Sequence, residues 1–313
     1  MKRFASGKVA LAILIASPLA ARPAVAHGIA GARFFPATIA TDDPAVSDEL
    51  SLPTFSSSLT GDEPAAWEWD VSGEYSKRIT PDLGVSIGET WTKLKAPGSP
   101  AAAGFQDLET TLKYHLFTSA PHEAMISAGL VVDWGATGAS KVGADPVTEF
   151  TPTLYFGKGA GDLPAALGLL RPLALTGVVG LSIPEQEREA APGPPGAPIP
   201  RVLAWGVALE YSLPYLSSQV KDYGLPGWAE DLTPLIEATF QTPLSRGGDV
   251  RTIGTFDPGV IWSGQKIQVG AEALLPMNRR SGRGVGFIIQ LHFFLDDMFP
   301  HGIGRPLLGG QER

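Results

Sequence analysis

The 313-residue sequence contains no cysteine, and only 18% of its residues are charged. Without cysteine the chain needs no disulfide in an oxidising compartment and offers no thiolate to a metal ion. The formal net charge is −8, and no stretch is rich in lysine and arginine. An acidic chain without a basic stripe argues against nucleic acid as a partner.

The strings that usually accompany catalysis are also missing. There is no GxSxG motif, and GKGAG at 157–161 lacks the ending of a phosphate-binding P-loop. The five histidines show neither the HxxxH nor the HExxH spacing of a metal site. We therefore expect no metal, no cofactor and no catalytic residues, and a protein that is not an enzyme. A hydrolase that uses His115 or His292 stays open as an alternative, because a catalytic triad needs no fixed spacing.

The first 26 residues have the three parts of a secretory signal peptide. Lys2, Arg3 and Lys8 form a basic start, and residues 9–16 are apolar but too short to span a bilayer. Ala24 and Ala26 then supply the small-x-small cleavage signal. Residues 1–26 are thus expected to direct export and to be removed.

Beyond residue 26, the composition favours strands over helices. The chain has 37 glycines and 28 prolines, yet 44% of its residues are hydrophobic, which suits many strands joined by turns. Residues 163–184 are largely apolar, with Arg171 as the one charged residue, so a membrane helix at this place is an alternative to the strands. Pro172 and Gly177 disfavour a helix there, and the residues after Pro172 alternate as in a strand.

Alternation of apolar and polar residues is clearest at 67–77, WEWDVSGEYSK. Successive side chains of a strand point to opposite faces, so Trp67, Trp69 and Tyr75 share one face, and Glu68 and Asp70 lie on the other. The same phase returns as far as residue 296. A soluble sandwich would have to cover its apolar face with a second sheet within about a hundred residues, whereas transmembrane barrel strands expose it to lipid.

We therefore predict an all-β fold, an antiparallel up-and-down transmembrane β-barrel of about 12 strands. The expected strands are 49–58, 66–77, 83–95, 104–117, 124–135, 147–157, 169–183, 201–213, 232–243, 250–262, 266–276 and 284–296. The expected organisation is a signal peptide at 1–26, a periplasmic N-terminal segment at 27–48 that can also be a plug, the barrel at 49–297, and a C-terminal tail at 298–313.

An even number of strands places both ends of the barrel in the periplasm. The external loops are then 60–66, 96–104, 135–146, 184–200, 245–249 and 276–284, and the periplasmic turns are 78–82, 118–123, 157–168, 214–231 and 263–265. Two of the periplasmic turns are long enough for short helices. We also expect the loop at 184–200 to be a docking segment if the barrel is closed.

Four strings of the sequence resemble a group of Gram-negative outer-membrane transporters, similar to the phenol-degradation meta-pathway barrel family. They are FQDLETTLKYHLF at 105–117, FTPTLYFGKGAGDLP at 150–164, LRPLALTGVVGLSIP at 170–184 and GVGFIIQLHFFLDDMFP at 284–300. The resemblance implies an outer-membrane barrel of similar strand number that moves small, often hydrophobic molecules. It implies no site residue.

The strand phase predicts which polar side chains face the lumen. They are Glu68, Asp70, Glu74, Asp107, Glu109, Lys113, His115, Asp133, Glu210, Glu237, Glu272, Gln290 and His292. Acids dominate this set, so an open pore should favour cations. Alternatively, the acids pair with Lys113 and with loop arginines such as Arg279, Arg280 and Arg283, and the barrel is a closed anchor.

The expected partners follow from this fold. They are outer-membrane lipid around the barrel, a small-molecule solute within it, and the barrel-assembly machinery during insertion. The apolar strand faces also fit a neighbouring protomer, so a homo-oligomer is a further possibility.

Overall fold

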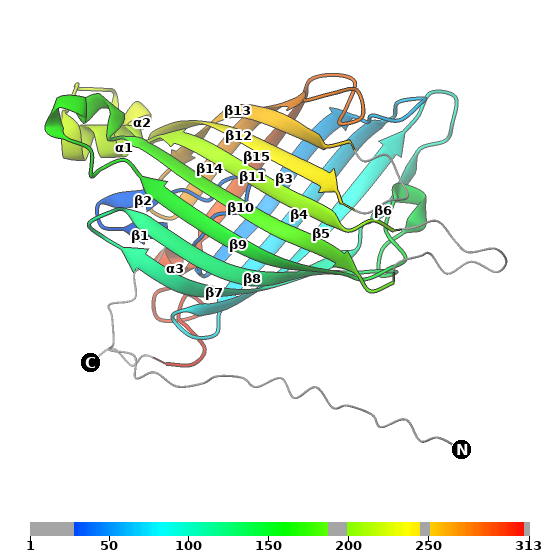
Figure 1. The fold of residues 1–313 in the computed structure, drawn as a ribbon, viewed down its shortest axis with the longest axis horizontal. Helices are drawn as coiled ribbons and strands as arrows, with labels where there is room; N and C mark the ends of the chain where they lie inside the picture. The colour runs from blue at the N-terminus through cyan, green and yellow to red at the C-terminus, as the bar shows by residue number, and fades with distance from the viewer. Residues whose placement is uncertain (1–27, 187–198, 245–250, 310–313) are drawn as a thin grey trace, which may run out of the picture.

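The computed structural model describes residues 28–186, 199–244 and 251–309, and the expected signal peptide lies outside them. Twelve strands form the wall of one barrel (Figure 1). They are β3 (Glu49–Leu59), β4 (Trp67–Arg78), β5 (Leu83–Lys95), β7 (Leu108–Ser119), β8 (Ala124–Trp134), β9 (Glu149–Gly159), β10 (Leu173–Pro184), β11 (Val202–Tyr211), β12 (Leu232–Pro243), β13 (Ile253–Ser263), β14 (Ile267–Pro276) and β15 (Gly286–Phe294).

Every wall strand pairs antiparallel with its neighbours in the chain, and β15 pairs with β3. In that last pair Ile289 lies opposite Phe55 and Phe293 opposite Leu50, which closes the barrel. In the part of the chain that the structure describes, closure gives each of the twelve wall strands a partner on both sides, as a strand wall in lipid requires. The predicted fold, an antiparallel barrel of about twelve strands, is confirmed.

Each of the twelve predicted strands corresponds to a wall strand, but one prediction needs correction. The expected strand 104–117 is divided into β6 (Ala102–Phe105) and β7, and both pair with β5. Asp107 therefore lies in the connection between them rather than in a strand. The alternative of a membrane helix at 163–184 is wrong, because Leu173–Pro184 is the strand β10. Among the described residues, no helix is long and apolar enough to cross a membrane.

The outer surface of the wall is apolar. On β11 the side chain of Leu209 is 48% exposed, whereas its neighbour Glu210 is 1% exposed and points into the barrel. The same contrast recurs around the wall. The exposed apolar side chains include Trp67, Val85, Ile87, Leu112, Leu130, Leu154, Leu175, Ile236, Val260, Val269 and Ile289. A continuous belt of this kind around a closed barrel is a lipid-facing surface.

The long connections lie at two ends of the barrel. One end, here the termini end, carries both ends of the barrel domain together with η2 (Ala165–Leu170), α1 (Leu213–Tyr215), η3 (Leu216–Val220), α2 (Gly227–Glu230) and α3 (Leu295–Met298). The other, the loop end, carries η1 (Ser140–Val142). The short helices expected in the two long turns are therefore present, as η2 in one and α1, η3 and α2 in the other.

Residues 28–48 lie at the termini end and inside the wall. The short strands β1 (Gly28–Ala30) and β2 (Arg33–Phe35) form a hairpin, and irregular chain follows to residue 48. Phe35 and Ala30 pack with Met125 of β8 and Ala174 of β10. The segment is thus built into the barrel, and we call residues 28–48 the plug.

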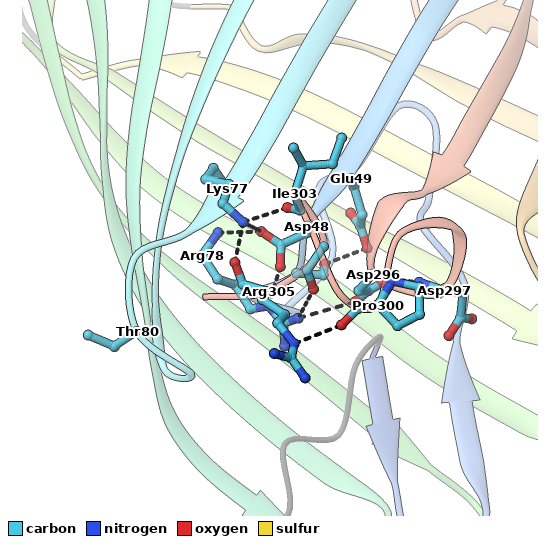
Figure 2. A network of polar contacts seen from close by, with 12 residues as sticks. Asp48, Glu49, Lys77, Arg78, Thr80, Asp296, Asp297, Pro300, Ile303 and Arg305 are labelled. Carbon is cyan, nitrogen blue, oxygen red and sulfur yellow. Dashed lines mark hydrogen bonds and ion pairs between the residues drawn. The ribbon is translucent and has the colours of Figure 1, made fainter. Parts of the chain in front are cut away.

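The last residue of the plug, Asp48, is fixed by a buried ionic cluster (Figure 2). Its side chain is completely buried and accepts hydrogen bonds from Lys77 Nζ at 2.6 Å and Arg78 Nε at 2.8 Å. The same two basic side chains form hydrogen bonds with the C-terminal tail. Lys77 donates to the carbonyl oxygens of Ile303 and Arg305, and Arg78 to that of Gly304. The cluster therefore joins the plug, the wall and the tail.

Candidate functional site

The barrel encloses a cavity of about 920 Å³. Its walls are residues of eight strands, β4 and β7 to β13, and Ala40 and Asp42 of the plug also line it. The size is that of a site for a small molecule. Because the plug contributes to the lining, the cavity is bounded on one side by the plug and on the other by the loops.

The charge of the cavity is unevenly distributed. Acids come from β4, from β7 and the residues before it, and from β8 and β9: Glu74, Asp107, Glu109, Asp133 and Glu149. The facing strands β10 and β11 contribute small or uncharged residues such as Gly180, Ser182, Ala204 and Gly206. One side of the lumen is therefore acidic, the facing strands are neutral, and Arg280 of a loop adds one positive charge to the lining. The acids outnumber it, which suits a cation or a solute with a cationic group.

The predicted residue Asp107 has a second role at the rim of this cavity. Its Oδ1 accepts hydrogen bonds from the backbone N–H groups of Thr137 and Gly138, and its Oδ2 from that of Asp145 at 2.5 Å. These bonds hold the connection between β8 and β9 over the lumen. Asp107 thus positions the loop at the opening and also adds a negative charge to the lining.

The plug is bonded to the wall through Glu237, which is completely buried on β12. Its two carboxyl oxygens accept from the backbone N–H groups of three successive plug residues, Ile39 at 2.7 Å, Ala40 at 3.1 Å and Thr41 at 2.5 Å. Three donors converging on one carboxyl group satisfy polar backbone that would otherwise be buried without partners.

The plug also reaches across the full width of the barrel. Gln268 on β14 donates to the carbonyl of Ala37, and Ser127 on β8 donates to the carbonyl of Pro44. In the ring of twelve, β14 and β8 are six strands apart in either direction. Residues 37–44 therefore cross the lumen from one wall to the opposite one.

The predicted lumen residue Lys113 binds residues of the plug. Its ammonium group lies 2.8 Å from Asp42 Oδ2, donates to the carbonyl of Asp43, and lies 4.3 Å from the centre of the Tyr155 ring. Burial raises the pKa of Asp43 well above its usual range, and the charge of Lys113 opposes that shift. The main inward base is thus paired with a plug acid rather than with the acids of the wall.

A second buried cluster fixes the start of the plug. The side chain of Arg33 is fully buried, its Nε lies 3.2 Å from Glu123 Oε2, and its Nη1 donates to the carbonyl of Pro172. The guanidinium stacks on Tyr215 at 3.9 Å, and the Tyr215 hydroxyl donates to Glu123 Oε1 at 2.7 Å. Burial raises the pKa of Tyr215, and the hydrogen bond to Glu123 raises it further. The plug is therefore held by ionic clusters at both ends.

The remaining predicted residues of β4 differ in what surrounds them. Glu74 is exposed and lines the cavity, whereas Asp70 accepts hydrogen bonds from Ser56 at 3.1 Å and Thr92 at 2.6 Å. Glu68 is half-buried and lies outside that lining. The three acids of β4 therefore have different surroundings, and of the three Glu74 alone belongs to the lining of the main cavity.

Three other predicted wall residues, Glu210, Gln290 and Glu272, are buried and lie outside the cavity lining. Glu210 accepts from Thr176 Oγ1 at 2.9 Å, and Gln290 donates to Thr54 Oγ1 at 3.2 Å. Glu272 is 4% exposed and lies on β14 opposite Gly259 of β13. The contacts of these residues are thus with neighbouring wall strands.

Both candidate histidines contact a serine. His115 Nδ1 lies 3.3 Å from Ser127 Oγ, and His292 Nδ1 lies 2.8 Å from Ser51 Oγ, with Glu49 Oε2 3.7 Å from His292 Nε2. The second set contains the residue types of a catalytic triad. However, His292 is 2% exposed, and neither it nor Ser51 lines the cavity. The set is therefore buried in the wall, outside the lining of the main cavity.

The three loop arginines lie at the loop end, and Arg280 also lines the main cavity. Arg279, Arg280 and Arg283 line a second hollow of about 520 Å³ at the loop end. Arg283 pairs at 2.5 Å with Glu63, which is an acid of a loop. Thus Arg283 does not neutralise an acid of the wall.

Several residues of the site were missed by the sequence analysis. Asp257 is completely buried on β13, beside Glu237 in the register of β12 and β13, and the alternation of β13 could have identified it. The partners Arg33 and Glu123 are 90 residues apart, and nothing local in the sequence connects them. The cluster of Asp48 with Lys77 and Arg78 was missed for the same reason.

No protein-family model and no curated protein matches this sequence. Among solved structures, the fold resembles the KdgM porin (10% identity, TM-score 0.45, over 77% of this chain and 97% of that one) and the NanC porin (9%, 0.45, 77% and 98%). It also resembles the COG4313 outer membrane channel from Pseudomonas putida F1 (14%, 0.49, 80% and 95%). At these identities the likeness concerns the fold alone.

Proposed function

We propose that this chain is a pore for small molecules in the outer membrane of a Gram-negative bacterium, and that its lumen favours cations. The observation that carries the proposal is the 920 Å³ cavity inside a closed barrel, with acids gathered on one side. The apolar belt supports the membrane location, since a barrel with this surface is stable in lipid. Export through a signal peptide at residues 1–26 and insertion by the barrel-assembly machinery belong to the same proposal.

The plug determines when such a pore conducts. Residues 37–44 cross the lumen and are bonded to β12, β14, β7 and β8, so a solute passes only when part of this segment yields. The irregular backbone of residues 36–48 has few hydrogen bonds of its own, and side chains of the wall supply most of its partners. Such a segment can shift by exchanging side-chain bonds without disrupting the strands.

The solute class follows from the lining. Carboxyl and hydroxyl groups line the cavity together with apolar side chains such as Val131 and Val178, and the acids suit a solute that carries a cationic group. Transport of hydrophobic molecules rests on the resemblance to the phenol-degradation barrel family. The apolar side chains of the lining are compatible with such molecules, but the acids do not specifically favour them.

A second candidate function is a closed barrel that anchors an envelope assembly. The observation in its favour is the plug, which is bonded to opposite walls and held by ionic clusters at both ends. Pairing between protomers through the apolar belt is compatible with either function.

Swelling of liposomes that contain the purified protein separates the two candidates. We expect faster swelling with a small cationic solute than with an anionic solute of equal size. Swelling rates that are the same for all solutes, and the same in liposomes without the protein, would favour the closed anchor. Hydrolysis of a chromogenic ester that is lost in His292→Ala would instead favour a hydrolase.

A further inference from the structure

At the termini end, the connections that contain η2 and α2 expose a group of large apolar side chains. We call residues 163–170 and 223–228 the shelf. Leu169 is 56% exposed, Leu167 and Leu170 are almost as exposed, and Trp228 is 70% exposed. Groups of exposed apolar side chains are costly in water, and they usually mark a contact surface.

The shelf extends to the outside of the wall. The Tyr211 hydroxyl donates to the carbonyl of Leu169 at 3.0 Å. Tyr211 has the same strand phase as Leu209, whose side chain belongs to the lipid-facing belt, whereas Glu210 between them points inward. The bond therefore holds η2 against the outer end of β11. Figure 1 shows α1 and α2 projecting from the barrel at this end.

Several backbone groups in and beside η2 are already hydrogen-bonded, which favours contact of this segment with an apolar phase. Leu167 N–H donates to Pro164 and Arg171 N–H to Gly168, while Tyr211 occupies the carbonyl of Leu169. Backbone that enters lipid must have its polar groups satisfied in this way. The apolar side chains of η2 are then free to interact with hydrocarbon.

The second segment of the shelf, together with Lys221 just before it, has the amphipathic residues of a membrane interface. Tyr223 is half exposed, and the Lys221 ammonium lies 4.9 Å from the centre of its ring. Tyrosine and tryptophan favour the headgroup region, and lysine extends its charge towards water from an apolar stem. Trp228, Tyr223 and Lys221 are therefore suited to the boundary between headgroups and acyl chains.

We propose that the shelf inserts into the bilayer at the headgroup boundary of the leaflet around the termini end, with phospholipid as its occupant. The argument is the continuity of the shelf with the belt: Leu169 lies beside the end of β11, and Leu175 and Leu209 continue the apolar surface along β10 and β11. The proposal rests on the barrel spanning a membrane, but it does not depend on conduction. The shelf fixes the depth at which the barrel sits.

Site-directed spin labelling tests this directly, because a chain without cysteine accepts single cysteines cleanly. The variants are Leu169→Cys and Trp228→Cys on the shelf, Leu209→Cys on the belt, and Ser218→Cys on the exposed polar turn. Each is labelled with a nitroxide in phospholipid vesicles, and collision rates with oxygen and with a water-soluble nickel complex are compared. Oxygen concentrates in lipid, whereas the nickel complex stays in water.

We expect the ratio of oxygen to nickel collisions at 169 and 228 to exceed that at 218 severalfold, and to lie below that at 209. A ratio at 169 and 228 equal to that at 218, with a high ratio at 209, would overturn the shelf proposal alone. A low ratio at 209 as well would overturn the membrane-spanning barrel itself. Shielding of 169 and 228 from both reagents, seen in native membranes but not in vesicles, would identify a protein as the occupant and also overturn the proposal.

Discussion

The backbone N–H of Ile39 donates to the carboxyl group of Glu237 at 2.7 Å, and this bond ties the plug to the inner face of β12. The neighbouring N–H groups of Ala40 and Thr41 use the second oxygen of the same carboxyl. One side chain thus organises three residues of irregular chain. The hydrogen bonds that the Glu237 carboxyl group accepts therefore determine how strongly the plug is held in the lumen.

Replacement of Glu237 by glutamine should loosen the plug. An amide keeps one acceptor oxygen and turns an N–H₂ group towards backbone donors, which should cost about 1–3 kcal/mol of plug binding. We expect more frequent channel openings in Glu237→Gln, measured in planar bilayers. Glu210→Gln is the matched control, because Glu210 is equally buried but bonds Thr176 of the wall. Equal opening frequencies in both variants would show that Glu237 does not hold the plug.

Locking the plug should have the opposite effect. A Cβ atom at Gly206 would lie 3.2 Å from Oγ1 and 3.3 Å from Cγ2 of Thr41, which brings two cysteines within disulfide range. In the double variant Thr41→Cys, Gly206→Cys, oxidation should reduce conductance and a reductant should restore it. The single variant Thr41→Cys controls for the substitution itself. Conductance that oxidation leaves unchanged would mean that solute passes beside a stationary plug.

Removal of acids from the cavity should reduce the cation preference. Each charge contributes on the order of 1 kcal/mol to a cation about 4 Å away in water, and the effect grows as salt is lowered. The triple variant Glu74→Gln, Glu109→Gln, Asp133→Asn should therefore shift the reversal potential towards zero. Glu63→Gln, at a loop residue paired with Arg283, should change it much less. A reversal potential that the triple variant leaves unaltered would place the selective step elsewhere.

The ionic cluster at Asp48 should be important for stability. Asp48→Asn leaves Lys77 and Arg78 buried with a weakened partner, and loss of one member of a buried ion pair costs about 3–5 kcal/mol. Lys158→Ala removes an exposed partner of Asp162 and should cost about 0–1 kcal/mol. Urea unfolding of the protein in detergent measures both. Similar midpoints for the two variants would show that the cluster does not fix the plug and tail to the wall.

The wall could be predicted from sequence because its signal is local. Leu209 and Glu210 on β11, like Trp67 and Glu68 on β4, show in single residues the alternation that every wall strand repeats. The division of strand 104–117 was missed because it depends on how β5 pairs with both β6 and β7, which the alternation does not reveal.

The arrangement of the plug could not be predicted in the same way. Ile39 and Glu237 are 198 residues apart, and Arg33 and Glu123 are 90 apart. Pro36 and Pro44 disrupt any period in the plug, so its position depends on hydrogen bonds to distant side chains. The list of inward acids was informative, but the sequence could not show that Glu237 binds the plug while Glu74 lines the cavity.

Single-channel recording of the wild-type protein under a potassium chloride gradient tests the central claim most directly. A conducting barrel with an acidic lumen should give discrete current steps whose reversal potential has the sign of cation selectivity. The same recording on Glu237→Gln extends the test to a barrel with a loosened plug. Absence of steps in both proteins, or a reversal potential of the anionic sign, would contradict the account.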